Sequence, residues 1–142
     1  MTSALRHEVT VNASIERAFE LFTARIGEWW PLRSHAVFGI GTVAFEGNLL
    51  VERARGGESV WAEVTEWSPP AALSLAWHPG GTPAEATNVR VTFETLGEQT
   101  LVTLIHTGWE NTQDPITEAA DYDQGWPPVL ADFARLANGT DR

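Results

Sequence analysis

Residues Tyr122 to Ala137 read YDQGWPPVLADFARLA and carry the clearest helical pattern in the chain. Apolar side chains recur there at intervals of three and four residues, which places them along one face of a helix: Tyr122, Trp126, Val129, Leu130, Phe133, Leu136 and Ala137. Polar residues occupy the opposite face: Asp132, Arg135 and Asn138. A helix with so wide an apolar face has to pack against a large surface, and we expect a sheet to provide it.

Two prolines determine where we expect this helix to begin. Proline has no N–H to donate and its ring crowds the preceding turn, but both defects are tolerated in the first turn of a helix. We therefore predict a main helix from about Trp126 to Ala137, with Pro127 near its first position and Gly139 just beyond its end. The preceding residues 110–120 are predicted to form a loop with at most one turn of helix.

The remainder of the chain is predicted to form a strand, a helix and then six strands. Leu5 to Val11 alternates as a strand does, and Ser14 to Ile26 has apolar residues at helical spacing. From Thr42 onward the period is two, which indicates six further strands: Val43 to Phe45, Leu49 to Arg53, Val60 to Trp67, Leu73 to His78, Thr87 to Thr95 and Leu101 to Trp109. Glycine- and proline-rich turns separate them and no helix interrupts, so the sheet is predicted to be antiparallel, in a single α+β domain over residues 1–142.

Composition excludes several classes of function. The chain has no cysteine, so disulfides and thiolate chemistry are excluded and a reducing cytoplasm fits. The net charge of −10, with no lysine, argues against nucleic acid and anionic membranes as partners. No apolar run approaches the roughly twenty residues that span a bilayer, and no signal-peptide core is present. We expect a cytoplasmic protein, and the lysine-free, alanine-rich composition suggests a bacterial source.

Catalytic and metal-binding motifs are missing from the sequence, whereas tryptophan is abundant. His7, His35 and His78 show no metal-ligand spacing, and no nucleophile elbow or phosphate-binding glycine loop occurs. We therefore expect no metal, no cofactor and no assigned catalytic residue. The seven tryptophans exceed what a core of this size needs, and tryptophan is well suited to lining a cavity or an interface.

Short motifs, in a consistent order, run along nearly the whole chain: Ala18-Phe19, Phe22-Thr23, Trp29-Trp30-Pro31, Phe45-Glu46-Gly47, Trp61-Ala62-Glu63-Val64, Trp67 to Pro70, Leu73 to Trp77, Val89 to Phe93, Thr100 to Leu104, His106 to Trp109, Gly125-Trp126 and Val129-Leu130. In this order they resemble the START/Bet v 1-like superfamily, also called SRPBCC, and within it the AHSA1-like domains related to the activator of Hsp90 ATPase. The resemblance implies a helix-grip fold: a curved antiparallel sheet of about seven strands wrapped around a long C-terminal helix, with a short N-terminal helix pair. It also implies a hydrophobic cavity between sheet and helix. Because that superfamily holds carriers, receptors, cyclases and co-chaperone domains, function has to be argued from the site.

The fold implied by the resemblance brings one set of side chains toward the cavity, and we take these as the candidate ligand-binding residues: Trp29, Trp30, Phe38, Trp61, Trp77, Phe93, Leu104, His106, Trp126 and Phe133. The favoured function is binding of a hydrophobic or aromatic small molecule. Two alternatives are a protein-interaction module acting on an Hsp90-like chaperone and a polyketide cyclase- or dehydratase-like enzyme that uses a cavity histidine or glutamate. Homodimer formation is left open.

Three titratable residues, His106, Glu52 and Glu63, could each have either a functional role in the cavity or a purely structural one. His106 shares the inward parity of the last strand, so it is either a polar anchor or acid–base group in the cavity, or a core histidine hydrogen-bonded to the C-terminal helix. Glu52 and Glu63 lie on strands whose parity the sequence leaves open. Each either faces the cavity, where it would transfer protons, or faces water like most strand glutamates.

Overall fold

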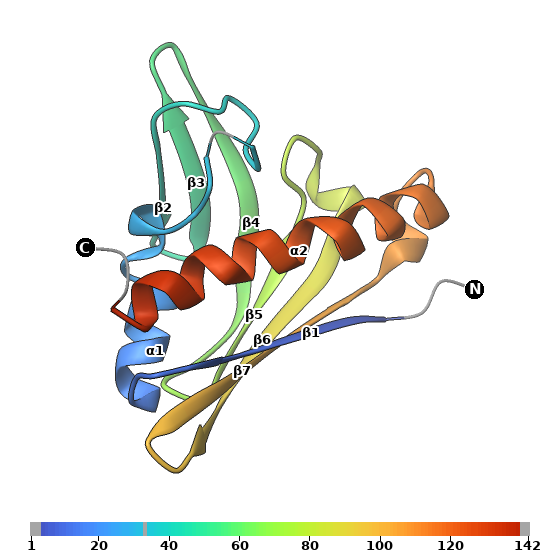
Figure 1. Cartoon of the computed structure of the whole chain (residues 1–142). Coiled ribbons are helices and arrows are strands. Elements are labelled where there is room, and N and C mark those ends of the chain that lie inside the picture. Colours follow the sequence, from blue (N-terminus) through green and yellow to red (C-terminus); the bar gives the residue numbers. More distant parts are fainter. Residues whose placement is uncertain (1–3, 33, 140–142) are drawn as a thin grey trace.

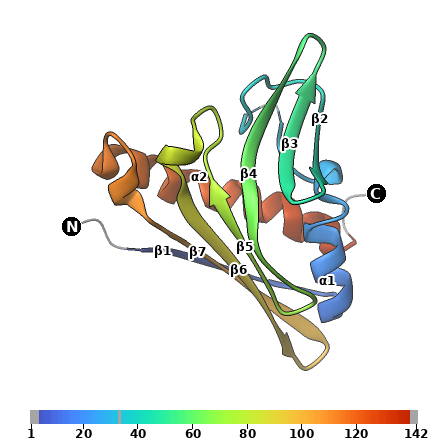
Figure 2. The same cartoon turned by 180° about the vertical axis from the view of Figure 1, so that it is seen from behind.

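The computed structural model of the protein describes residues 4–32 and 34–139. Its helices and strands are β1 (Leu5–Val11), α1 (Ile15–Phe22), β2 (Thr42–Glu46), β3 (Leu49–Ala54), β4 (Gly57–Ser68), β5 (Ala72–Trp77), β6 (Thr87–Leu96), β7 (Gln99–Thr107) and α2 (Pro115–Ala137). A short 3₁₀ helix, Ile26–Glu28, follows α1. The strands form one antiparallel, seven-stranded sheet in the order β1-β7-β6-β5-β4-β3-β2. The sheet curves around α2, which crosses its concave face (Figures 1 and 2). The predicted α+β helix-grip architecture is confirmed.

The C-terminal helix begins eleven residues earlier than predicted, at Pro115 instead of Trp126. The side chain of Asp114 accepts a hydrogen bond from the Thr117 N–H and caps the helix, and Pro115 occupies the first turn. Pro127 and Pro128 therefore lie inside α2 and not at its start. Propensity alone disfavours that position, but packing of the long apolar face against the sheet outweighs it.

The N-terminal helix is shorter than the predicted range of residues 14–26. Ser14 caps α1 by accepting a hydrogen bond from the Arg17 N–H at 3.2 Å. The helix ends where the Thr23 hydroxyl donates to the Phe19 carbonyl at 2.7 Å. The separate 3₁₀ turn that follows supplies the second member of the expected helix pair.

Strand β4 carries the irregularities that give the sheet its curvature. Leu50 of β3 pairs with Ala62 and Val51 pairs with Val60, so Trp61 between them has no partner on β3. A second register shift lies between Val64 and Glu66, on the side facing β5. Such bulges bend a strand and turn side chains away from strict alternation, which explains why the inward face of β4 could not be assigned from the sequence.

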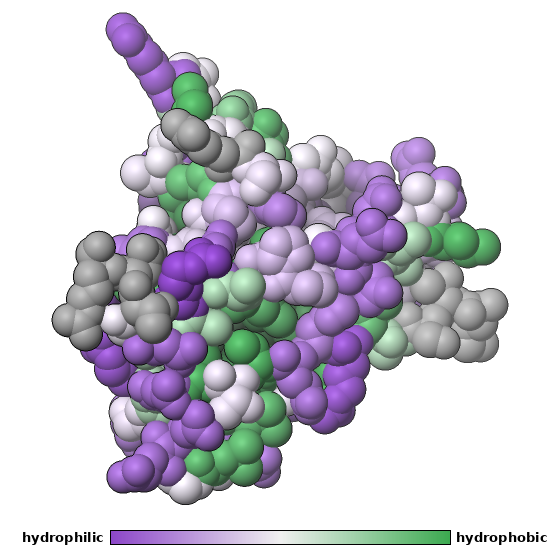
Figure 3. Space-filling view, viewed as in Figure 1, coloured by the Kyte–Doolittle hydropathy of each residue, from purple (hydrophilic) through white to green (hydrophobic). Residues whose placement is uncertain are grey.

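Apolar side chains of α1, α2 and the concave face of the sheet form one core. Phe22 contacts Trp29, Phe93 and Phe133 with ring centroids 5.1, 5.8 and 5.2 Å apart. The outer face of α2 is mainly hydrophilic, and hydrophobic atoms show between α2 and the lower part of the sheet (Figure 3). None of the helices in the described ranges is long and apolar enough to cross a membrane.

Candidate functional site

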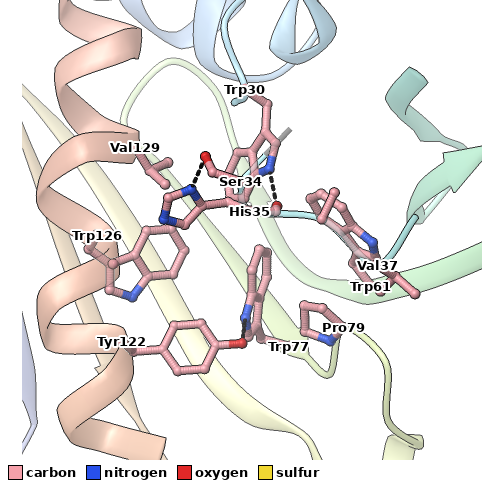
Figure 4. A pocket seen from close by; sticks show the side chains of 12 residues that line it. Trp30, Ser34, His35, Val37, Trp61, Trp77, Pro79, Tyr122, Trp126 and Val129 are labelled. Atoms are coloured by element: carbon pink, nitrogen blue, oxygen red, sulfur yellow. Dashed lines mark hydrogen bonds between the residues drawn. The ribbon is translucent and has the colours of Figure 1, made fainter. Parts of the chain in front are cut away.

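A cavity of about 280 Å³ lies between α2, the segment that follows Trp30, and strands β4 and β5. Its walls are shown in Figure 4, with the α2 side chains on one side and Trp61 on the other. The lining residues are Trp30, Ser34, His35, Ala36, Val37, Trp61, Trp77, Pro79, Tyr122, Gly125, Trp126 and Val129. Its volume is near the lower end of the roughly 300–1,000 Å³ typical of small-molecule sites. None of these lining residues is lysine or arginine.

Aromatic rings in mutual contact make up most of the wall. Trp77 lies 6.0 Å from Trp61 and 5.5 Å from Trp126 between ring centroids. Trp30 contacts Trp61 at 5.1 Å and Trp126 at 6.1 Å. These tilted and edge-on contacts are the favourable arrangements of aromatic pairs, so the rings form one continuous apolar surface toward the cavity.

Tyr122 brings a hydroxyl group to this apolar wall. Its oxygen accepts a hydrogen bond from Nε1 of Trp77 at 3.0 Å, which leaves the hydroxyl proton available to a ligand. Burial raises the pKa of Tyr122 above its usual value of 10; the bond from Trp77 acts in the opposite direction, and Glu118 adds to the rise. The hydroxyl is therefore protonated at neutral pH and can act as a donor.

His35 is the second polar group in the cavity. Its Nδ1 is hydrogen-bonded to the Ser34 hydroxyl at 2.7 Å, and its carbonyl accepts from Nε1 of Trp30 at 2.6 Å (Figure 4). No residue within 4–32 or 34–139 hydrogen-bonds to Nε2 of His35, which lies beside Gly125 of α2. That nitrogen can donate to or accept from a ligand, depending on the tautomer.

His106 lies behind the cavity wall and is not among the lining residues. Its Nδ1 accepts from Nε1 of Trp126 at 3.0 Å, and its Nε2 lies 2.6 Å from the Thr87 hydroxyl. Burial lowers the pKa of His106 to about 3, so the ring is neutral at physiological pH. Its contact with the C-terminal helix is the one expected of a hydrogen-bonded core histidine.

The other candidate ligand-binding residues lie in three different places. Trp30, Trp61, Trp77 and Trp126 line the cavity. The remaining apolar candidates are buried in the packed core away from it: Trp29, Phe93, Leu104 and Phe133. Phe38 is 42% exposed and borders a shallow hollow outside the cavity.

The two strand glutamates face different environments. Glu52 is fully buried and its oxygens accept hydrogen bonds from Trp61 and from the segment after Trp30. Glu63 is hydrogen-bonded to Nε2 of His78 at 2.7 Å on the far side of β4, outside the cavity. Neither lines the cavity, and no group of three metal-ligating side chains occurs within the described ranges.

Neither the Tyr122 hydroxyl nor the His35 ring was predicted from the sequence as part of the site. Tyr122 stands four residues before Trp126 on the same helical face, so a helix extended toward Asp114 would have identified it. His35 lies in a segment without periodicity, and no local signal indicates which way its ring points.

Comparison with known proteins agrees with this fold. Residues 12–138 match the family of activator of Hsp90 ATPase homolog 1-like proteins. No curated protein sequence matches the chain significantly.

Solved structures with the same architecture include the Aha1 dimer from Colwellia psychrerythraea, which is 22% identical with a TM-score of 0.71 over 96% of this chain and 97% of that one. CalC, a self-sacrificing resistance protein from Micromonospora echinospora, is 22% identical with a TM-score of 0.65 over 96% and 95% of the two chains. Txn09, an anthrahydroquino-γ-pyrone synthase solved as a complex, is 29% identical with a TM-score of 0.61 over 96% of each chain. With the family match spanning most of its length, this chain belongs to the activator of Hsp90 ATPase homolog 1-like family.

Proposed function

We propose that the protein binds a small, planar aromatic molecule in the cavity beneath α2. The observation that carries this proposal is a set of five aromatic side chains around about 280 Å³, together with two polar groups that still have hydrogen-bonding capacity. A few placed polar groups within an apolar cavity are typical of small-molecule sites.

The two polar groups indicate the chemistry of the ligand. The Tyr122 hydroxyl would donate to a carbonyl or ether oxygen, and Nε2 of His35 would pair with a hydroxyl or carbonyl group on the same ligand. None of the cavity-lining residues within 4–32 and 34–139 is lysine or arginine, and for those residues a neutral aromatic compound bearing oxygen substituents fits better than a phosphate or sulfate ester. Txn09 supports this class, because its name describes a product with aromatic and pyrone rings.

The test is a calorimetric titration with 1,8-dihydroxyanthraquinone and a panel of pyrones and flavones. We expect saturable, one-to-one binding that Trp77→Leu weakens at least about tenfold, since buried tryptophans dominate such sites. Trp67→Leu is the matched control: Trp67 is 49% exposed and contacts Phe19 and Phe45, away from the cavity.

Absence of binding across the panel, together with a ligand-free mass for protein purified natively from its own source, would refute the proposal. Equal affinity of both variants would place the binding elsewhere on the molecule. Mass spectrometry of the recovered compounds would also show whether any of them is chemically altered, which would point to an enzyme.

A further inference from the structure

Glu52 is a fully buried carboxylate held almost entirely by the backbone of one short segment. Its Oε2 accepts from the N–H groups of Phe38 at 2.8 Å and Gly39 at 3.3 Å. Its Oε1 accepts from the Val37 N–H at 2.8 Å and from Nε1 of Trp61 at 3.0 Å. None of the ion pairs found within residues 4–32 and 34–139 involves Glu52.

Three successive N–H groups that converge on one anion form a backbone nest. Gly39, the last donor of the three, has a φ of +79°, a left-handed conformation that favours glycine. In many proteins such a nest holds a phosphate or another external anion. Here the chain's own carboxylate, presented by β3, occupies it.

The same carboxylate reaches two walls of the cavity. Val37 lines the cavity and continues the stretch that contains His35, while Trp61 of β4 forms the adjoining part of the wall (Figure 4). Both donate to the same oxygen, Oε1 of Glu52. The position of the segment and the orientation of the Trp61 indole therefore depend on one buried group.

Burial of a carboxylate is costly, and an apolar residue of similar size would serve the core at lower cost. The segment itself has no helix or strand, and it exposes Val37, Phe38 and Ile40 to solvent. Hydrogen bonds from Trp30 and Ser34 hold His35, and the bonds to Glu52 oppose a rearrangement of residues 37–39 that would bury these side chains. We call the four hydrogen bonds accepted by Glu52 the clamp. Its main effect is to fix the position of the segment, and its contribution to core packing is secondary.

We propose that Glu52 is the positioning residue of the cavity: it holds residues 37–39 as part of a preformed wall, so that a ligand meets an ordered site. This inference rests on the proposed function and deepens it. A preformed wall spares the ligand the entropic cost of ordering the segment, which raises affinity and slows dissociation.

The central variant is Glu52→Gln, whose amide keeps one acceptor oxygen but turns an NH₂ group toward the N–H donors. Glu94→Gln, at an exposed position on β6, is the matched control with the same change in charge. Trp61→Phe removes only the indole donor and keeps an aromatic side chain in the wall. It replaces Glu52→Gln as the test variant if Glu52→Gln fails to fold.

Amide hydrogen exchange of Val37, Phe38 and Gly39, followed by NMR, tests the clamp without any ligand. In Glu52→Gln we expect exchange at these amides to be at least about tenfold faster, with amides of β6 and β7 unchanged. Stopped-flow dissociation of 1,8-dihydroxyanthraquinone, monitored by tryptophan fluorescence, should be about tenfold faster than in the wild-type protein, with a smaller change in Trp61→Phe and none in Glu94→Gln.

Unchanged exchange at residues 37–39 in a folded Glu52→Gln protein would overturn the proposal, as would dissociation within twofold of the wild-type rate. If the wild-type protein binds no compound of the panel, the proposed function fails, and the exchange measurement alone then decides whether Glu52 holds the segment.

Discussion

Trp126 donates a hydrogen bond from its indole Nε1 to Nδ1 of His106 at 3.0 Å. Because Nδ1 is the acceptor, the neutral ring carries its proton on Nε2, which donates to the Thr87 hydroxyl at 2.6 Å. That hydroxyl in turn donates to the Trp77 carbonyl at 3.3 Å. A continuous buried chain of hydrogen bonds therefore links the side chain of one cavity wall to the backbone of another, and it is complete only while His106 is neutral.

The first prediction concerns acid stability. Burial lowers the pKa of His106 from 6.5 to about 3, so the unfolded chain binds this proton more tightly than the native protein does. The stabilisation from neutral His106 is complete above pH 6.5 and is lost as the pH falls toward 3. Between pH 7 and pH 4.5 we expect this group alone to remove about 2–3 kcal/mol from the free energy of unfolding.

Urea unfolding of the wild-type protein and of His106→Gln at several pH values provides the measurement. The variant should be less stable at pH 7 and should lose less stability on acidification, with other titrating groups cancelling in the difference. If the free energy of unfolding changed with pH equally in the two proteins, the pKa of His106 would be the same in the native and the unfolded state, and the prediction would be wrong.

The second prediction uses Tyr122, the single tyrosine in the sequence. Burial raises its pKa above 10, so the native protein should form tyrosinate only at a higher pH than the unfolded chain. Stability should accordingly fall as the pH rises above 10, because the unfolded chain releases this proton first. Near-ultraviolet absorbance titration measures tyrosinate directly; a native midpoint at or below that of the urea-unfolded protein would contradict the prediction.

The third prediction separates stability from binding at Gly125. A Cβ added there would lie 3.8 Å from Cδ2 and Nε2 of His35, an ordinary contact that folding tolerates. Gly125→Ala should raise the free energy of unfolding by up to about 1 kcal/mol, because glycine is a poor helix former. The new methyl group would cover Nε2 of His35 and narrow the cavity, so affinity for the anthraquinone should fall several-fold.

Gln124→Ala, at the exposed neighbouring position of α2, is the control for helix propensity. It should leave affinity unchanged in calorimetry. An unchanged affinity in Gly125→Ala would mean that ligands do not use the surface between His35 and α2.

Much of the fold could be predicted from local patterns. The limits of β1 agree with the prediction, and the six later strands differ from it by three residues or fewer at each end. Helix α2 was predicted eleven residues too short because Pro127 and Pro128 are strong local signals for a helix start. Tertiary packing overrides that signal, and no local rule measures how much apolar area a longer helix would bury.

By itself the sequence determined the period of the strands and of α2 from Trp126 onward, the buried face of most of them, and the surplus of tryptophan that indicates a cavity, because these properties depend on neighbouring residues along one element. Only the tertiary structure decided which tryptophans line that cavity and which are packed beside Phe22. It also placed the carboxylate of Glu52 in the interior, where distant N–H groups satisfy it, and joined His106 to Trp126. The physical reason is that hydrogen-bond partners and wall positions are set by contacts between elements far apart in the chain, and a β-bulge such as the one at Trp61 changes the direction of a side chain without changing the periodicity around it.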